Sequence, residues 1–166
     1  MLMPTPLRRP PERLTLDRVL EFMQLMWAVD HQLQSVSKRM ESTVGLTVPQ
    51  RLSLLLIGRD PHVSAAELAG TLHLHPGTIS GIVRRLEDAG LITRQIDGSD
   101  ARRTRLALTR RGHEANRRRK GTFEDAVRKA IAASTRQDIA GAERVLRRLA
   151  SQLQAIVGAR VSGETL

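Results

Sequence analysis

Apolar side chains recur at helical spacing along most of the chain. From Thr15 to about Thr43 they keep a helical period, but they spread over more than one side of the expected helix. A helix that is apolar on several sides has several neighbours. A second helix is predicted to begin after Thr47, where T-x-x-Q forms a capping box with Pro49 in the first turn, and to end near Gly58.

The stretch from 64 to 90 predicts two short helices separated by a turn. Ser64 and Glu67 form a capping box at the start of the first helix. Pro76 suits the first position of the second helix, where its missing N–H costs nothing. Gly90 suits the left-handed residue that follows a helix end. The second helix has one apolar side, made of Ile79, Ile82, Val83 and Leu86, and one small, polar and basic side, made of Gly77, Thr78, Ser80, Gly81, Arg84 and Arg85.

The period changes after Gly90. Residues 91–96 and 103–108 are short strand-like runs, and the turn-forming residues 97–100 between them predict a hairpin. A helix-turn-helix followed by a basic hairpin is a winged helix. The alternative is a small packed helical core with a solvated hairpin. The polar and basic side of the second helix favours the winged helix, because that side suits a DNA major groove.

Helices also flank this region. One is expected from Arg110 to about Ala133, and a last one is capped either by Ser134 with Gln137 or by Thr135 with Asp138. A coiled-coil-like apolar seam runs along the last helix at Ile139, Ala142, Leu146, Leu149, Leu153 and Ile156. Packing the terminal helices on each other leaves surplus seam, which a two-fold homodimer would bury. We interpret residues 1–14 as a disordered arm and residues 158–166 as a frayed tail.

Composition points to a polyanionic partner. The 166 residues carry 27 Lys+Arg against 17 Asp+Glu, a formal net charge of +10. One Trp, two Phe and no Tyr argue against an RNA-binding sheet built on stacked aromatics, and the absence of cysteine excludes disulfides and thiolate zinc sites. No signal peptide or membrane-length apolar run is evident, so a soluble cytoplasmic protein without membrane association is expected.

Catalytic and metal chemistry find little support in the sequence. It contains no P-loop, G-x-S-x-G or H-E-x-x-H pattern. His73-x-His75 could suggest a metal, but no Asp or Glu lies nearby at ligand spacing. We therefore expect neither an enzyme nor a bound metal or cofactor.

Arginines supply the expected DNA contacts. Arg84 lies midway along the second helix and can reach a guanine edge bidentately. Arg110 and Arg111 occupy a helix start, where the helix dipole favours acidic residues, so a nearby phosphate would explain them. The basic run at 117–120 is interpreted as a solvated helical face; a nuclear signal is the weaker alternative.

Asp30 and His31 interrupt the apolar stripe of the first helix. They could form a partly exposed turn with a local hydrogen bond. Alternatively, they form the polar corner of a ligand pocket beside Met26 and Trp27.

Residues 15–157 resemble the MarR family of bacterial transcriptional regulators. Asp100 and Arg102, followed by Leu108-Thr109 and Gly112, match the family's D-x-R…LT-x-x-G pattern, and E-x-x-G-L occurs at 87–91. The resemblance implies that Arg102 enters a minor groove at the wing tip while Asp100 braces the hairpin. It also implies that the exposed side of the second helix faces the major groove. His75 departs from the usual Ser, Thr or Asp cap, which suggests a less well satisfied helix start. Gly81 stands where many members carry a larger side chain, so either this site reads fewer bases or the backbone approaches the groove more closely there.

The combined expectation is a mainly α protein with a single domain at 15–157. Its winged-helix lobe spans 46–109, and its dimerisation helices span 15–44 and 110–157. It would act as a homodimeric repressor on a pseudo-palindromic double-stranded operator, relieved by a small aromatic or anionic effector. The alternative is an architectural protein with little sequence preference. The expected DNA-binding residues are Thr78, Ser80, Gly81, Arg84, Arg85, Asp100, Arg102, Arg103, Arg110 and Arg111, and the expected effector-binding residues are Met26, Trp27, Asp30 and His31.

Overall fold

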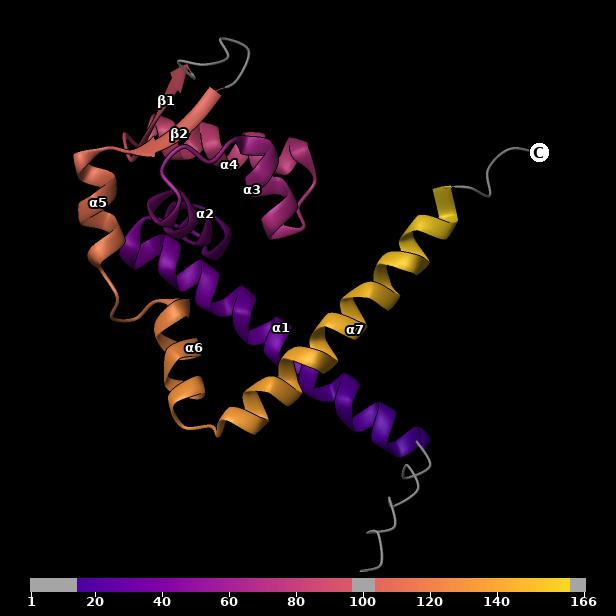
Figure 1. Cartoon of the computed structure of the whole chain (residues 1–166). Coiled ribbons are helices and arrows are strands. Elements are labelled where there is room, and N and C mark those ends of the chain that lie inside the picture. The colour runs from indigo at the N-terminus through magenta and orange to yellow at the C-terminus, as the bar shows by residue number, and fades with distance from the viewer. Residues whose placement is uncertain (1–14, 97–103, 162–166) are drawn as a thin grey trace, which may run out of the picture. The chain divides into compact units, whose positions relative to one another are not determined.

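The computed structural model describes residues 15–96 and 104–161. The chain divides into two units, residues 1–116 and residues 117–166. It is mainly helical with one β-hairpin, as the sequence predicts (Figure 1). The elements are α1 (Leu16–Val44), α2 (Val48–Arg59), α3 (Ala65–Leu72), α4 (Pro76–Asp88), β1 (Ile92–Ile96), β2 (Thr104–Leu108), α5 (Arg110–Arg117), α6 (Phe123–Ala132) and α7 (Arg136–Val161).

The long first helix is confirmed. Thr15 caps it by accepting a hydrogen bond from the backbone N–H of Arg18, and Gly45 ends it with a φ of +77°. Met40, near its C-terminal end, is buried. The N-terminal half differs, because in this single chain it leaves large apolar side chains exposed, namely Leu16, Leu20, Phe22, Met23, Leu25, Trp27 and Val29.

Both capping boxes expected in the first unit are present. The side chain of Gln50 accepts from the Thr47 backbone N–H at 2.9 Å, and the Thr47 hydroxyl accepts in return from the Gln50 N–H at 3.5 Å. Glu67 and Ser64 make the same reciprocal pair at the start of α3, at 2.7 and 3.2 Å. Each box satisfies two backbone donors that a helix start leaves open, so the starts of α2 and α3 are fixed locally.

One aliphatic core holds α2, α3, α4 and the hairpin together, and Figure 1 shows these elements grouped together. Burying one Val, Leu or Ile side chain stabilises a fold by roughly 1.5–3 kcal/mol. The four predicted apolar residues of α4 are all buried. The core cluster consists of Leu46, Leu54, Ile57, Val63, Leu68, Ala69, Ile79, Ile82, Val83, Leu86, Leu91, Ile92 and Leu106.

The strands β1 and β2 form the predicted antiparallel hairpin. Ile92 pairs with Leu108 at its base, and Ile96 pairs with Thr104 at its far end. Gly90 adopts the expected left-handed conformation, with a φ of +65°, between α4 and β1. Alternation along β2 places Leu106 in the core.

The expected single helix from Arg110 to about Ala133 is wrong. The structure has two helices there, α5 and α6, separated by residues 118–122. Gly121 adopts a left-handed φ of +74°, and the Thr122 hydroxyl donates to the Arg119 carbonyl at 2.7 Å. Glycine reaches this conformation without steric cost, so the chain turns at Gly121 instead of continuing the helix.

In the second unit, Thr135 and Asp138 form the cap of α7. The Asp138 carboxylate accepts from the Thr135 backbone N–H at 3.1 Å, and the Thr135 hydroxyl accepts from the Asp138 N–H at 3.2 Å. The hydrogen bonds from Thr135 lower the pKa of Asp138. Between the two alternatives in the sequence, the structure therefore selects this pair over Ser134 with Gln137.

Asp125 is the mostly buried carboxylate of α6. Its side chain is only 9% exposed, and it pairs with Lys129 at 3.0 Å and with Arg128 one turn along the helix. The hydrogen bond from Lys129, followed by that from Arg128, lowers the pKa of Asp125 despite the opposing effect of burial.

Candidate nucleic-acid interface

The second helix of the helix-turn-helix, α4, begins at Pro76 behind an unusual cap. His75 occupies the N-cap position, and its Nδ1 accepts a hydrogen bond from the Gly77 backbone N–H at 3.1 Å. The imidazole thus supplies the N-cap acceptor that a Ser, Thr or Asp side chain usually provides. The expectation that this helix start is less well satisfied is therefore wrong, because an imidazole nitrogen that carries no proton accepts a hydrogen bond.

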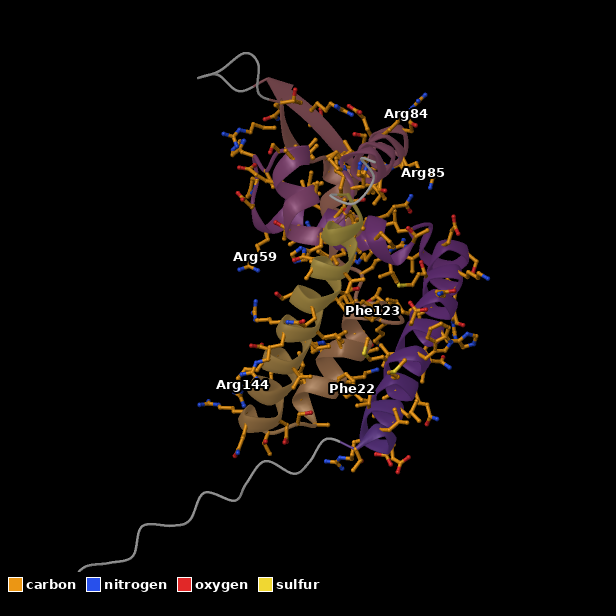
Figure 2. The ribbon with its side chains drawn as sticks, turned by 90° about the vertical axis from the view of Figure 1, so that its right-hand side faces the viewer. Phe22, Arg59, Arg84, Arg85, Phe123 and Arg144 are labelled. Atoms are coloured by element: carbon orange, nitrogen blue, oxygen red, sulfur yellow. The ribbon has the colours of Figure 1, made fainter. Side chains whose placement is uncertain are left out.

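The exposed side of α4 carries the expected residues. Ser80 donates to the Pro76 carbonyl at 2.9 Å, and Arg84 lies 3.9 Å from Asp88 in a solvent-exposed i,i+4 pair. Such a pair is weak, so Arg84 can exchange Asp88 for another partner at little cost. Figure 2 shows Arg84 and Arg85 extending outward from α4. The five candidates of this helix, Thr78, Ser80, Gly81, Arg84 and Arg85, are all exposed.

Gly81 lies in the middle of this surface. A Cβ placed on it would meet no atom within 4 Å. Internal packing therefore does not require glycine there. An exposed backbone in mid-helix permits close approach of an external partner, which is one of the two readings that the sequence left open.

The turn between α3 and α4 is set by a second histidine. His73 ends α3 with a φ of +52°, and its backbone N–H reaches back to carbonyls of the last turn. Among the described residues, no group of three or more His, Cys, Asp or Glu could hold a metal ion. His73 and His75 instead shape the backbone of the turn and the start of α4.

A dense set of hydrogen bonds joins the end of α4, the base of the hairpin and the start of α5. The Thr109 hydroxyl donates to the Gly90 carbonyl at 2.7 Å and accepts from the Gly112 N–H at 3.1 Å. The Thr109 N–H donates to the Leu91 carbonyl at 3.0 Å. A Cβ on Gly112 would lie 2.0 Å from that same carbonyl oxygen, so only glycine fits there. The L-T-x-x-G pattern thus has a physical basis as a clasp between hairpin and helix.

The two arginines at the start of α5 are exposed and have local neighbours. Arg110 lies 3.5 Å from Glu114. A Cβ on Gly90 would lie 3.3 Å from Arg111 Nη1, which places this guanidinium near the C-terminal end of α4, where a helix dipole favours cations. Both guanidinium groups therefore have a local neighbour, and both side chains remain exposed at the surface.

Asp100, Arg102 and Arg103 lie outside the described residues, between the two strands of the hairpin. The strands on either side of them, β1 and β2, are described.

The expected effector residues all belong to α1. Met26 is half-buried, whereas Trp27, Asp30 and His31 are exposed, Trp27 by 78%. The helix continues through them without a turn, and Asp30 accepts from the Gln34 side chain at 2.8 Å. The local hydrogen bond expected at this polar pair is therefore present, but inside a continuous helix.

Sequence reasoning missed three arginines that tie elements together. Arg51 of α2 is buried and donates from Nη1 to the Ala115 carbonyl at 2.7 Å and from Nη2 to the Asn116 carbonyl at 3.2 Å, near the end of α5. Arg94 and Arg105, in the two strands, contact residues of the helix-turn-helix. No motif marks these arginines in the sequence, because the partners of all three are distant in sequence or on another element.

An exposed polar and basic second helix followed by a hairpin defines a winged helix-turn-helix DNA-binding protein. Residues 46–104 match the MarR family. An HTH-type transcriptional repressor of Mycobacterium tuberculosis is 31% identical over 110 residues, which cover 66% of this chain and 79% of that protein. The organic hydroperoxide resistance transcriptional regulator of Bacillus subtilis is 30% identical over 88 residues, covering 53% of this chain and 60% of that protein. The chain belongs to the MarR family of DNA-binding transcriptional regulators.

Solved structures show the same fold. Streptococcus pneumoniae FabT in complex with DNA gives a TM-score of 0.63 at 22% identity, covering 86% of this chain and 99% of that one. A crystal structure of MarR gives 0.54 at 28% identity, covering 92% and 99%. Within the described ranges, no helix is long and apolar enough to cross a membrane.

Proposed function

We propose that the protein is a homodimeric repressor that binds a pseudo-palindromic operator through one α4 helix per half-site. The observation that carries the proposal is the exposed side of α4, which is small, polar and basic on a helix whose opposite side is fully buried. A helix of this kind fits a major groove. Two such helices related by a two-fold axis would bind half-sites about 10 bp apart. The structurally similar FabT was crystallised in complex with DNA, which supports DNA binding as the function of this fold.

Reading and positioning fall to different residues in this proposal. Arg84, Arg85, Thr78, Ser80 and the backbone at Gly81 face the base edges. In this proposal Arg102 enters a minor groove, Asp100 braces the hairpin, and Arg103 adds a further DNA contact. Arg110 and Arg111 contact phosphates. Phosphate contacts place the protein on DNA, whereas base contacts carry the sequence preference.

The second copy would cover the exposed apolar surfaces of α1 and α7. On α7 these include Val145, Leu146, Leu153, Ile156 and Val157. Large exposed apolar surfaces are uncommon on monomers and mark association sites. A two-fold dimer buries the same seam of both copies in one interface.

The proposed effector site lies on α1. A small aromatic or anionic compound would bind beside Met26 and Trp27, with Asp30 and His31 as polar contacts, and would lower DNA affinity. Quenching of Trp27 fluorescence by a series of benzoates should then parallel the release of operator DNA. An unchanged effector response in Asp30→Ala and His31→Ala would place the pocket elsewhere.

The DNA proposal is tested by titrating the wild type, two test variants and one control variant against operator and scrambled duplex at two salt concentrations. Arg84→Ala should weaken operator binding by roughly 1–3 kcal/mol per half-site and relax the preference at one base position. Arg111→Ala should weaken both duplexes alike and reduce the salt dependence by about one unit per lost contact. Arg144→Ala on α7 controls for the loss of one positive charge.

Two outcomes contradict the DNA proposal. Equal binding of the wild type to operator and scrambled duplex favours the architectural alternative. If Arg84→Ala weakens binding to both duplexes equally, α4 is not the helix that reads the base sequence.

The dimer is tested by sedimentation with two neighbouring substitutions on α7. Leu153→Glu places a charge on the apolar seam and should yield monomer, since burying an unpaired carboxylate is costly. Gln154→Glu adds the same charge one residue along the helix and should remain dimeric. A dimer of unchanged affinity in Leu153→Glu would contradict an interface through this seam.

A further inference from the structure

The wing is fastened to the helix-turn-helix along the outer edge of β2. The His62 N–H donates to the Leu106 carbonyl at 3.2 Å, and the Leu106 N–H donates to the Val63 carbonyl at 2.9 Å. The strand β2 therefore has β1 on one edge and the segment that precedes α3 on the other. This second pairing connects the wing directly to the start of the helix-turn-helix.

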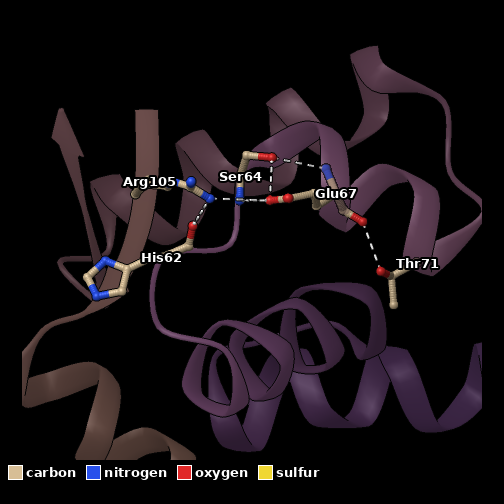
Figure 3. Close-up of polar contacts among 5 residues, drawn as sticks. All are labelled: His62, Ser64, Glu67, Thr71 and Arg105. Atoms are coloured by element: carbon tan, nitrogen blue, oxygen red, sulfur yellow. Dashed lines mark hydrogen bonds and ion pairs between the residues drawn. The ribbon is translucent and has the colours of Figure 1, made fainter. Parts of the chain in front are cut away.

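Arg105 reinforces this connection (Figure 3). Its Nη1 donates to the His62 carbonyl at 2.9 Å and lies 3.8 Å from Glu67 Oε2. That oxygen also accepts from the backbone N–H and from the hydroxyl of Ser64, each at 2.7 Å. One carboxylate thus completes the cap of α3 and pairs with a wing arginine.

Arg94 makes the matching contact from the other strand. Its Nε lies 3.0 Å from Glu87 Oε2, in the last turns of α4. Arg94 is paired directly with Leu106 in the hairpin ladder, so it shares the face of Leu106, whereas Arg105 lies on the opposite face. The two arginines therefore tie the hairpin, from its two faces, to the two helices of the helix-turn-helix.

We propose that Arg105 and Arg94 are positioning residues that set the orientation of the wing toward DNA through Glu67 and Glu87. The proposal rests on the proposed function, in which the residues between the two strands enter the groove. A rotation of the hairpin about its own axis would break one ion pair or the other. These two ion pairs, which we call the brace, thus fix the angle of β1 and β2 relative to the helix-turn-helix.

The pairs are partly exposed, with side chains 26–60% accessible, and each is worth little to global stability. The effect should therefore be visible in DNA binding and small in unfolding. A pair of this kind changes an equilibrium by up to about fivefold, so we expect a loss of operator affinity of up to about fivefold per wing.

Glu67→Gln gives the sharpest test, because the two explanations predict opposite signs. Glutamine keeps the capping box of α3 but loses the charge that faces Arg105. The variant is one charge more positive, so general electrostatics predicts tighter DNA binding. The brace predicts weaker binding instead, together with faster hydrogen exchange at the Leu106 amide. Glu143→Gln on α7 makes the same charge change outside the wing and should not weaken binding.

Duplex length separates positioning from a general structural role. Glu67→Gln and Arg105→Gln should lose affinity for an operator with its flanks and bind like the wild type to a duplex trimmed to the two half-sites. Equal losses on both duplexes, or binding by Glu67→Gln that matches or exceeds the wild type, would overturn the brace. Failure of the proposed function would look different, because the wild type itself would then not distinguish operator from scrambled DNA.

Discussion

Replacing Gly112 by alanine should break the clasp between the wing and α5. An added Cβ would lie 2.0 Å from the Leu91 carbonyl oxygen and 3.0 Å from its carbonyl carbon. A carbon and an oxygen in contact are normally about 3.3 Å apart, so one backbone must move by more than about 1 Å. Both backbones belong to packed elements, Leu91 being 9% exposed and Gly112 buried, and neither can move that far freely.

The cost can be worked from two contributions. Forcing an extra carbon into a packed site costs about 1–3 kcal/mol. Movement of α5 would also strain the bonds of Thr109 to Gly90, Leu91 and Gly112, each worth about 1 kcal/mol. We therefore expect Gly112→Ala to destabilise the protein by about 3 kcal/mol or more, a large part of the roughly 5–15 kcal/mol that stabilises a typical domain.

The assay is urea unfolding followed by far-ultraviolet circular dichroism. Gly70→Ala is the matched control, since Gly70 lies in α3 and a Cβ there would meet no atom within 4 Å. That variant should gain about 0.5–1 kcal/mol from the higher helix propensity of alanine. A Gly112→Ala protein that unfolds within 1 kcal/mol of the wild type would refute the close approach to Leu91.

Three further substitutions test the helix starts and the α4 surface. His75→Ala removes the acceptor of the Gly77 N–H and should cost about 1 kcal/mol in urea unfolding, with His75→Ser restoring most of it. Gly81→Ala should raise stability by about 0.5–1 kcal/mol and yet weaken operator binding in the same preparation, if DNA approaches the backbone there. Asp125→Asn should destabilise the protein at neutral pH. Because the folded-state pKa of Asp125 is lowered from its ordinary value of 3.8, the difference from the wild type should vanish in acid titrations as the pH falls through that lowered pKa.

Local signals predicted most of the fold. The capping boxes at Thr47 and Ser64 gave the starts of α2 and α3, and the apolar periods gave α1, α4 and α7. These signals work because helix starts and buried faces are decided within a few residues of chain. The change of period after Gly90 gave the hairpin for the same reason.

The break between α5 and α6 was missed for an equally physical reason. Arginine and lysine are good helix formers, so the basic run at 117–120 favours continuing the helix. A single glycine inside a helical pattern lowers helix propensity without deciding the structure. In the structure α5 ends at Arg117, and the left-handed Gly121 together with the Thr122 hydrogen bond to Arg119 forms the turn that precedes α6.

In the candidate site, too, local features were predicted from the sequence and contacts between elements were not. The side chains on the exposed side of α4 followed from helical geometry alone. The partners of Arg51, Arg94 and Arg105 did not, because each contact joins two elements whose approach is set by the packed core. The prediction for His75 was based on its residue type alone. Whether it caps α4 depends on the orientation of its Nδ1 atom, which accepts from the Gly77 N–H.

The aliphatic core of the winged-helix lobe has an optical consequence. The sequence contains three aromatic residues, Phe22 and Trp27 in α1 and Phe123 in α6, and none between 46 and 116. Tryptophan emission and near-ultraviolet dichroism therefore report on α1 and α6 and are blind to the core that positions α4. A single tryptophan introduced at a core leucine would give the DNA-binding half of the molecule its own signal. Its transition could then be compared with that of Trp27, to ask whether the two regions unfold together.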